Sequence, residues 1–276
     1  MDQITRDYIT INGGKTYFEI AGQGDWLVLG HAGIVDSGMW EEQMAFFSRY
    51  FRVVRYDLRG FGKSDPVAGP MSRRQELGQL MQQLSIEKAA LVGCSLSGEA
   101  VLDFALEHAE KVAALVLVST VPSGFEMMGE PPAELLGMFA AMEQGDLQRV
   151  TELQMRLSID GPFRQPEQVN QDVRQAAAAM NRIAIANRTA ITADLQPLDP
   201  PALPAAHRLS EVHAPTLIVA GALDHPELLR AAAWMEKGIA HARKVILPES
   251  AHLPNMERPA EFNEAVLEFL LGEEKS

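Results

Sequence analysis

The sequence contains a single cysteine, Cys94, so an internal disulfide is excluded. Its cysteine and histidine residues also lack the spacing of a zinc site, so we expect no metal. Apolar runs such as VAALVLV are far shorter than the roughly 20 residues that a membrane-spanning helix needs. The opening MDQITRDYIT lacks a basic stretch followed by an apolar run. We therefore expect no signal peptide and a cytoplasmic location.

Basic residues are in deficit: 24 Lys and Arg stand against 37 Asp and Glu, which gives a formal net charge of −13. Nucleic acid requires a basic surface that neutralises its phosphates, and an anionic membrane surface makes a similar demand. We therefore expect neither nucleic acid nor membrane as a partner. The acidic surface is typical of a protein kept in solution by its charge.

Nucleotide-binding motifs are incomplete. The stretch GFGKS at 60–64 ends like a phosphate-binding loop, but position 57, where that loop has its first glycine, is Asp57. No G-x-G-x-x-G stretch follows a predicted strand. The sequence therefore disfavours nucleotide binding, and we expect no cofactor.

Strand and helix patterns alternate at both ends of the chain. We predict strands near 8–13, 15–22, 26–31, 51–58, 89–94, 113–120, 215–224 and 243–250, with helices near 39–50, 72–84, 96–108, 225–239 and 259–272. Such alternation predicts an α/β fold with a mainly parallel sheet and helices on both faces. Between 122 and 211 helical patterns dominate, which divides the chain into a core (1–121), a helical cap (122–211) and a second part of the core (212–276). A cap at the carboxyl edge of the sheet would roof the ligand crevice.

The stretch ALVGCSLSGEAVLDF places Ser95 at an abrupt join between a strand and a helix. Such a join presents the serine hydroxyl at the carboxyl edge of the sheet, and its crowding requires small neighbours, which Gly93, Ser97 and Gly98 provide. The usual pattern, G-x-S-x-G, has glycine where this chain has Ser97. Capping of the helix is the alternative role for Ser95.

Two further residues favour the catalytic role. A serine hydroxyl needs a base within hydrogen-bond reach, and the base needs an orienting group. Asp224 ends the predicted strand PTLIVAGALD, and His252 comes two residues after the predicted strand RKVILPES. This order, Ser95, Asp224, His252, is that of a nucleophile, its acid and its base in such sheets. We therefore predict that the three side chains meet at one edge.

The oxyanion formed by attack on a carbonyl needs two N–H donors. Leu96 would supply one at the N-terminus of its helix, where the helix dipole also favours negative charge. Gly33, in the loop GHAGIVDSGMW, would supply the other, because a glycine lets the backbone come close to the substrate. His31 in the same loop is predicted to be a structural hydrogen-bonding group.

These motifs resemble the serine α/β-hydrolase superfamily over nearly the whole chain. The resemblance rests on His31-Ala32-Gly33, YDLRGFGKSD, GCSLSG, GALD and AHLPNMERPAEF, and is strongest to the lidded carboxylesterase and enol-lactonase branch. It implies an eight-stranded α/β sheet with the helical cap inserted after the sixth strand. Ala32 replaces the commoner glycine, and Pro226 shortens the loop after Asp224. Within YDLRGFGKSD, we expect polar side chains to brace a loop.

The cap is rich in methionine and arginine. We predict an apolar substrate pocket, because methionine adapts to varied shapes, with these lining residues: Ile34, Phe125, Met128, Met138 and Met142. The arginines are expected to lie mostly on solvated faces, with one of them available for a substrate carboxylate. They are Arg149, Arg156, Arg164, Arg174, Arg182 and Arg188.

Together these features predict a metal-free serine hydrolase that cleaves a small-molecule carboxylic ester or lactone through an acyl-enzyme. The same triad resembles that of cofactor-free perhydrolases and C–C bond hydrolases, so both stay open. A ligand receptor on a hydrolase scaffold is the alternative from a different class. Epoxide hydrolases and dehalogenases are disfavoured because their nucleophile is an aspartate.

Overall fold

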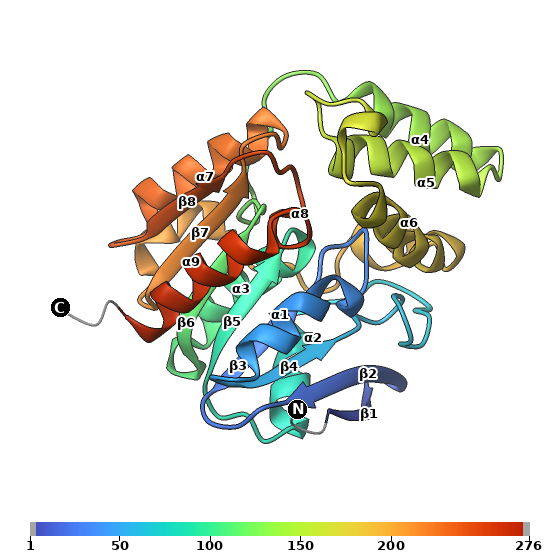
Figure 1. The fold of residues 1–276 in the computed structure, drawn as a ribbon. Helices are drawn as coiled ribbons and strands as arrows, with labels where there is room; N and C mark the ends of the chain where they lie inside the picture. The colour runs from blue at the N-terminus through green and yellow to red at the C-terminus, as the bar shows by residue number, and fades with distance from the viewer. Residues whose placement is uncertain (1–3, 273–276) are drawn as a thin grey trace.

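The computed structural model describes residues 4–272. Residues 1–3 and 273–276 lie outside the described residues, and so does the start of the stretch in which we expect no signal peptide. One eight-stranded sheet forms the centre of the molecule (Figure 1). Its strands are β1 (Thr5–Ile11), β2 (Gly14–Ala21), β3 (Trp26–Gly30), β4 (Arg52–Tyr56), β5 (Ala89–Cys94), β6 (Val112–Val118), β7 (Thr216–Gly221) and β8 (Arg243–Leu247). The predicted α/β fold is confirmed.

The strand order is β1-β2-β4-β3-β5-β6-β7-β8. The pairs β1–β2 and β2–β4 are antiparallel, and every pair from β4 to β8 is parallel. The carboxyl ends of β3, β5, β7 and β8 therefore lie along one edge of the sheet. All the predicted catalytic residues follow one of these ends.

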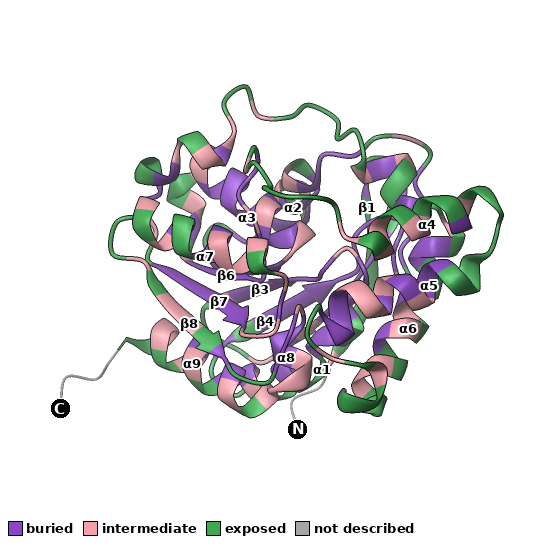
Figure 2. Cartoon of the chain, turned by 90° about the horizontal axis from the view of Figure 1, so that it is seen from above, coloured by how far each residue is buried: buried purple, intermediate pink, exposed green. Residues whose placement is uncertain are grey.

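Helices cover both faces of the sheet (Figure 2). On one face lie α2 (Arg73–Gln83), α3 (Leu96–Glu107) and α7 (Pro226–Gly238). On the other lie α1 (Glu41–Phe47) and α9 (Pro259–Leu271), which follows the short α8 (Pro254–Glu257). Strands of this sheet are buried on both sides, so β5 and β7 are apolar almost throughout.

Each face of the sheet has its own hydrophobic core. Leu80, Phe104 and Met235 belong to the core beneath α2, α3 and α7. Phe47 and Phe262 belong to the core beneath α1 and α9. These side chains are at most 1% exposed, and their burial fixes the helices against the strands.

The chain between β6 and β7 is helical. Its main helices are α4 (Ala133–Glu143), α5 (Leu147–Met155) and α6 (Gln171–Ala186), which stand apart from the two layers on the sheet (Figure 1). Single 3₁₀ or π-helical turns occur here at Arg156–Asp160, Pro166–Gln168, Ala190–Asp194, Ala205–His207 and Leu209–Glu211, and elsewhere at Ser37–Trp40 and Ala109–Lys111. None of the helices within residues 4–272 is both long and apolar enough to cross a membrane.

Hydrogen bonds from α6 and the chain after it anchor this segment to the core. Asn181 Nδ2 donates to the Ile34 carbonyl over 2.9 Å, and Thr189 Oγ1 donates to the Gly60 carbonyl over 2.7 Å. Arg73 on α2 pairs with Asp194 over 2.8 Å. The contact with Ile34 places α6 directly against the loop that carries Gly33.

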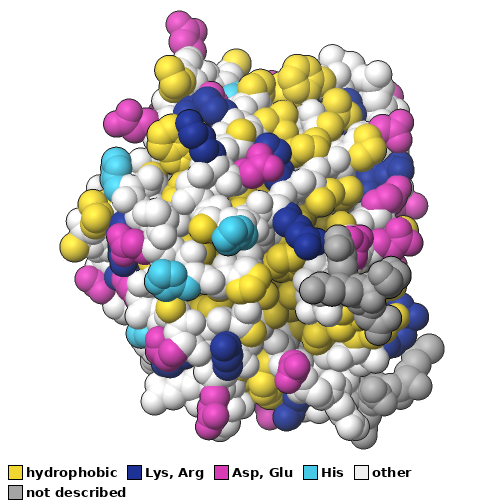
Figure 3. Space-filling view, turned by 90° about the vertical axis from the view of Figure 1, so that its left-hand side faces the viewer, with side chains coloured by type: hydrophobic (Ala, Val, Ile, Leu, Met, Phe, Trp, Pro, Cys, Tyr) yellow, Lys and Arg dark blue, Asp and Glu magenta, His cyan; other side chains and the backbone are white. Residues whose placement is uncertain are grey.

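The edge strand β8 lies on the side of the molecule shown in Figure 3, where acidic, basic and hydrophobic side chains are interspersed. Arg243 and Lys244 stand in this strand, and Lys244 pairs with Glu236 of α7. Charged side chains on an edge strand oppose its pairing with another chain. The sheet can therefore end at β8 without a further strand.

We expect Leu29→Ala to lower the free energy of unfolding by about 2–5 kcal/mol, because Leu29 is 0% exposed in the central strand β3 and its loss leaves a cavity. Leu203→Ala is the control: Leu203 is 50% exposed, so the change should stay within about 0.5 kcal/mol. Urea unfolding of both variants measures the effect. Equal losses in the two variants would contradict this view of the core.

Candidate active site

Ser95 has the backbone geometry of a strained turn. It follows β5 directly and precedes α3, with φ 52° and ψ −112°. Its N–H donates to the Val118 carbonyl over 2.9 Å, and Thr120 Oγ1 donates to its carbonyl over 2.7 Å. A non-glycine residue adopts such a conformation only where the surroundings enforce it, and such strain is concentrated at functional sites.

The atoms packed around Ser95 leave room only for small residues at the neighbouring positions. A Cβ atom on Gly93 would lie 2.4 Å from the Ser97 carbonyl oxygen, and one on Gly98 would lie 2.5 Å from Thr120 Cβ. Both distances are far below van der Waals contact. The crowding expected from the sequence is therefore present at both positions.

Asp224 and His252 are hydrogen-bonded to each other. Asp224 comes three residues after β7, is 2% exposed, and its Oδ2 lies 3.0 Å from His252 Nδ1. The other carboxylate oxygen accepts the backbone N–H of His225 over 2.8 Å. With Nδ1–H donating to Asp224, the lone pair of His252 is on Nε2. The acid thus fixes the tautomer that a general base requires.

The His252 backbone lies beside the turn that carries Ser95. Cys94 Sγ donates to the His252 carbonyl over 3.8 Å, and the His252 N–H donates to the Ser158 carbonyl over 3.2 Å. Cys94 is fully buried, and burial raises the pKa of its thiol well above the usual value. Cys94 therefore serves as a contact between the two loops, in keeping with the packing role expected for it.

The pKa of His252 reflects two opposing effects. Burial lowers it, whereas the charge and the hydrogen bond of Asp224 raise it, and the net result is a pKa above 6.5. An imidazolium at this position is thus stabilised by its neighbour. The arrangement suits a base that must hold a proton during part of a reaction.

Gly33 and Leu96, the predicted oxyanion donors, lie next to each other. A Cβ atom on Gly33 would be 3.1 Å from Leu96 Cδ2 and 3.3 Å from Leu96 Cβ. Leu96 is the first residue of α3. Among residues 4–272, no backbone carbonyl accepts either N–H group. Both donors are thus available to a ligand.

Ser97 joins the turn to the loop after β3, which carries His31 and Gly33. Ser97 is 1% exposed, and its hydroxyl donates to the His31 carbonyl over 2.6 Å. A Cβ on Gly30 would lie 2.7 Å from Ser97 Cβ, so the glycine in β3 makes room for the serine. Serine in place of the usual glycine therefore adds a hydrogen bond between the two segments that carry the proposed donors.

His31 is a structural group, as expected. Its Nε2 accepts the Leu58 N–H over 2.9 Å, and Nδ1 lies 2.8 Å from the Ala32 carbonyl. Complete burial lowers the pKa of His31 to about 4, so the ring is neutral at pH 7. His31 thus ties the loop after β3 to the segment after β4.

The YDLRGFGKSD segment is braced by polar side chains, which confirms that expectation. Ser64 Oγ donates to the Asp57 carbonyl over 2.6 Å, and the Asp57 carboxylate accepts the backbone N–H groups of Ser37 and Lys63. Arg59 donates to three carbonyls: that of Ile11 over 2.8 Å, and those of the consecutive residues Asp65 and Pro66. The bond from Ser37 ties this segment to the loop after β3, which also carries Gly33.

A buried ion pair that the sequence did not indicate holds the histidine loop. Arg164 donates to Glu257 over 2.7 Å, and the other Glu257 oxygen accepts the Ala251 N–H over 2.7 Å. The two side chains are 11% and 4% exposed. Burial outweighs the arginine and raises the pKa of Glu257. Arg164 is one of the arginines expected mostly on solvated faces. Its side chain is largely buried because it also donates to the carbonyls of Ile159, Asp160 and Glu249.

The residues predicted to line a substrate pocket have varied surroundings. Ile34 is buried beside Gly33, and Phe125 contacts Trp234 on α7 at a ring distance of 6.5 Å. Met128 is 69% exposed. Met138 and Met142 pack against a small cluster that includes Ile185. Their role in a pocket stays a prediction, with Ile34 the best placed.

No group of three or more His, Cys, Asp or Glu within residues 4–272 is arranged to hold a metal ion.

A family model described as the alpha/beta hydrolase fold matches residues 25–259. The chain belongs to the α/β-hydrolase family. It is 30% identical over 259 residues to a pimeloyl-[acyl-carrier protein] methyl ester esterase of Yersinia enterocolitica, covering 92% of this chain and 97% of the relative. It is 26% identical over 279 residues to a 2-hydroxy-6-oxo-6-phenylhexa-2,4-dienoate hydrolase of Comamonas testosteroni, covering 92% and 90%.

Solved α/β-hydrolase structures agree with this fold. An enol-lactonase from Burkholderia xenovorans LB400 superposes with a TM-score of 0.77 at 24% identity, covering 96% of this chain and all of that one. The resemblance inferred from the sequence motifs is thus confirmed at the level of the superfamily.

We expect Gly93→Ala to lower the free energy of unfolding by about 1–3 kcal/mol, because the added methyl overlaps the Ser97 backbone. Gly69→Ala is the matched control, since a Cβ there meets no atom within 4 Å. Thermal and urea unfolding of both variants measure the difference. A Gly93→Ala protein as stable as Gly69→Ala would show that the turn is not crowded.

Proposed function

We propose that the protein is a serine hydrolase that cleaves a carboxylic ester or lactone through an acyl-enzyme intermediate. The observation that carries the proposal is the 3.0 Å hydrogen bond between Asp224 and His252, made beside the strained turn of Ser95. A nucleophile, a base and an orienting acid are the parts that such catalysis requires.

In the first half-reaction, Ser95 Oγ attacks the carbonyl carbon while His252 Nε2 takes the hydroxyl proton. Asp224 stabilises the resulting imidazolium, in line with the raised pKa of His252. The oxyanion accepts hydrogen bonds from the N–H groups of Leu96 and Gly33. The tetrahedral intermediate then collapses, and His252 delivers its proton to the departing alkoxide.

In the second half-reaction, water takes the place of the alcohol. His252 removes a proton from the water as its oxygen attacks the acyl carbon. The same N–H groups stabilise the second oxyanion. Collapse breaks the bond to Ser95 Oγ, which regains its proton from His252, and the carboxylic acid leaves.

The helical segment 122–211 is proposed to be the cap over this site. Its base contacts the histidine loop through Ser158, and α6 contacts the oxyanion loop through Asn181. Helices in this position exclude bulk water, which strengthens the hydrogen bonds to the oxyanion. We also keep Ile34 as a residue of the substrate pocket.

The similarity to a methyl ester esterase, at 30% identity, supports an ester as substrate. The second candidate is a C–C bond hydrolase, which the similarity to a 2-hydroxy-6-oxo-6-phenylhexa-2,4-dienoate hydrolase favours. Both reactions use a nucleophile and a base at one carbonyl. Turnover of p-nitrophenyl esters against that of a vinylogous diketone distinguishes them.

We expect Ser95→Ala to lower kcat for p-nitrophenyl acetate by at least about 10⁴-fold, because the acyl-enzyme can no longer form. Ser210→Ala, at an exposed serine, should retain the activity of the wild-type protein. Circular dichroism checks that both variants are folded. Retained turnover in folded Ser95→Ala protein would refute the proposed mechanism.

The pH dependence of kcat/KM provides a separate test. His252 must be neutral to accept a proton, so kcat/KM should rise with pH, and its midpoint should lie above about 6.5 because Asp224 raises the pKa of His252. Asp224→Asn removes the carboxylate but leaves the burial. The midpoint should then move to lower pH, and kcat should fall by about 10³–10⁴-fold. An unchanged midpoint in Asp224→Asn would show that Asp224 does not raise the pKa of His252.

A further inference from the structure

The turn that presents Gly33 has few bonds to the rest of the molecule. Its backbone, residues 32–35, is closed by a bond of 3.2 Å from the Val35 N–H to the Ala32 carbonyl. Within residues 4–272, the Ile34 carbonyl is the one backbone group of this turn that bonds a residue outside the stretch 30–40. Glycine leaves the backbone free to rotate, so the direction of the Gly33 N–H depends on what holds its neighbours.

The partner of the Ile34 carbonyl is Asn181 of α6. Asn181 Nδ2 donates to that carbonyl over 2.9 Å and to Gln154 Oε1 on α5 over 3.0 Å. Both hydrogens of the amide nitrogen are thus used. Asn181 is 0% exposed, so solvent does not compete for these bonds.

The orientation of the Asn181 amide is fixed although it leaves one atom unsatisfied. Asn181 Oδ1 is buried and has no hydrogen-bond partner among the described residues. Turning the amide over would place that oxygen against the Ile34 carbonyl oxygen, which can only accept. A buried polar atom without a partner costs stability. The bond to Ile34 is therefore kept in spite of that cost.

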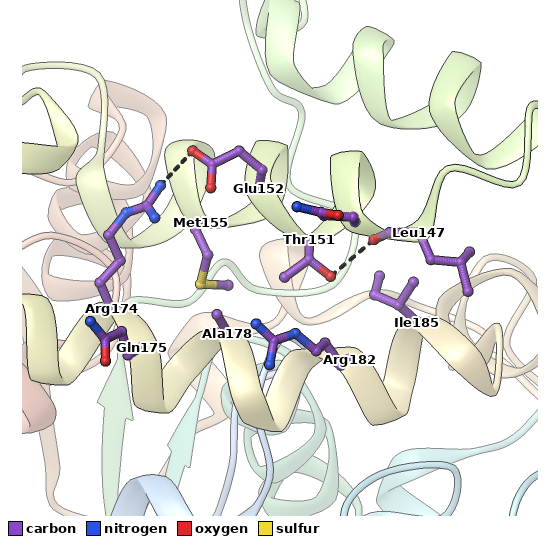
Figure 4. Close-up of a pocket in the computed structure, with 10 residues that line it drawn as sticks. Leu147, Thr151, Glu152, Met155, Arg174, Gln175, Ala178, Arg182 and Ile185 are labelled. Carbon is purple, nitrogen blue, oxygen red and sulfur yellow. Dashed lines mark hydrogen bonds and ion pairs between the residues drawn. The ribbon is translucent and has the colours of Figure 1, made fainter.

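The helical segment 122–211 has other bonds to the core, so its attachment does not depend on Asn181. Thr189 is 0% exposed, and its Oγ1 donates to the Gly60 carbonyl over 2.7 Å. Within the segment, α5 and α6 lie side by side and are joined by a bond of 2.7 Å from Arg174 to Glu152 (Figure 4). Asn181 is thus held by a pair of helices that are fixed to each other.

We propose that Asn181 is a positioning residue for catalysis: by holding the Ile34 carbonyl, it keeps the Gly33 N–H directed at the oxyanion. This role rests on the proposed function, which makes Gly33 an oxyanion donor. The oxyanion site then depends on the proposed cap, because the side chain that holds the core loop comes from α6. Donors stabilise an oxyanion best when they are fixed before the reaction, so a loosened turn slows the chemistry without weakening substrate binding.

Asn181→Leu tests this role, because leucine is similar in size but cannot donate a hydrogen bond. We expect kcat for p-nitrophenyl acetate to fall at least about tenfold, which is part of the roughly 10²–10³-fold loss caused by removing an oxyanion donor. KM should stay within about twofold, because the same N–H groups stabilise the oxyanions of both half-reactions.

Thr189→Val is the matched control. It removes a different buried hydrogen bond between the helical segment and the core, the bond to Gly60, and it does not touch the loop that carries Gly33. Its kcat should stay within about twofold of the wild-type value. Circular dichroism checks that both variants are folded.

Hydrogen exchange of the Val35 N–H, followed by NMR, tests the anchoring without turnover. This N–H closes the turn, so its exchange reports how often the turn opens. We expect exchange at least about fivefold faster in Asn181→Leu, and an unchanged rate in Thr189→Val.

An unchanged kcat in folded Asn181→Leu protein would overturn the inference. A raised KM with unchanged kcat would also overturn it, because Asn181 would then act in substrate binding. An equal loss of kcat in Thr189→Val would show that any loosening of the helical segment has the same effect. Missing turnover in the wild-type protein would refute the proposed function, whereas unchanged Val35 exchange in Asn181→Leu would refute the anchoring itself.

Discussion

Ser95 keeps a left-handed backbone because the end of β5 and the start of α3 are fixed from several directions. The neighbouring strand β6 accepts its N–H at Val118, and Thr120 bonds its carbonyl. Gly93 leaves just enough space for the backbone of Ser97. The energy of this strain is supplied by the surrounding sheet and cores. The position of the proposed nucleophile therefore depends on the assembly of the whole sheet.

The loops around Ser95 are held to one another as well as to the sheet. Ser97 donates to the His31 carbonyl in the loop that carries Gly33, and Cys94 donates to the His252 carbonyl in the histidine loop. Arg164 and Glu257 connect that histidine loop to the helical chain between β6 and β7. Removing one member of a buried ion pair leaves an uncompensated charge, so such pairs define geometry even where they add little net stability. A movement of the chain at Arg164 would therefore shift the loop that carries His252.

Much of the fold was predictable because its signals are local. The apolar strand before Ser95 and the helical pattern after it identify the turn, and Asp224 and His252 each follow a strand. Their shared edge then follows from the parallel sheet. The helical patterns between 122 and 211 likewise predict the helical chain found between β6 and β7.

Other features depend on contacts between distant segments, which the local pattern does not encode. Arg164 and Glu257 are 93 residues apart, and each looks like an ordinary surface charge in the sequence. In the sequence, Ser97 is only a departure from the usual motif. The structure shows that its hydroxyl bonds the His31 carbonyl. The exposure of Met128 depends likewise on where the chain between β6 and α4 runs.

A crystal structure of the protein after reaction with a fluorophosphonate tests the central claim most directly, because the adduct mimics the tetrahedral intermediate. The account predicts phosphorus bonded to Ser95 Oγ and the phosphonyl oxygen about 2.7–3.1 Å from the N–H nitrogens of Gly33 and Leu96. His252 Nε2 should lie within hydrogen-bond distance of the modified oxygen. An adduct on another residue, or a phosphonyl oxygen turned away from both N–H groups, would contradict it.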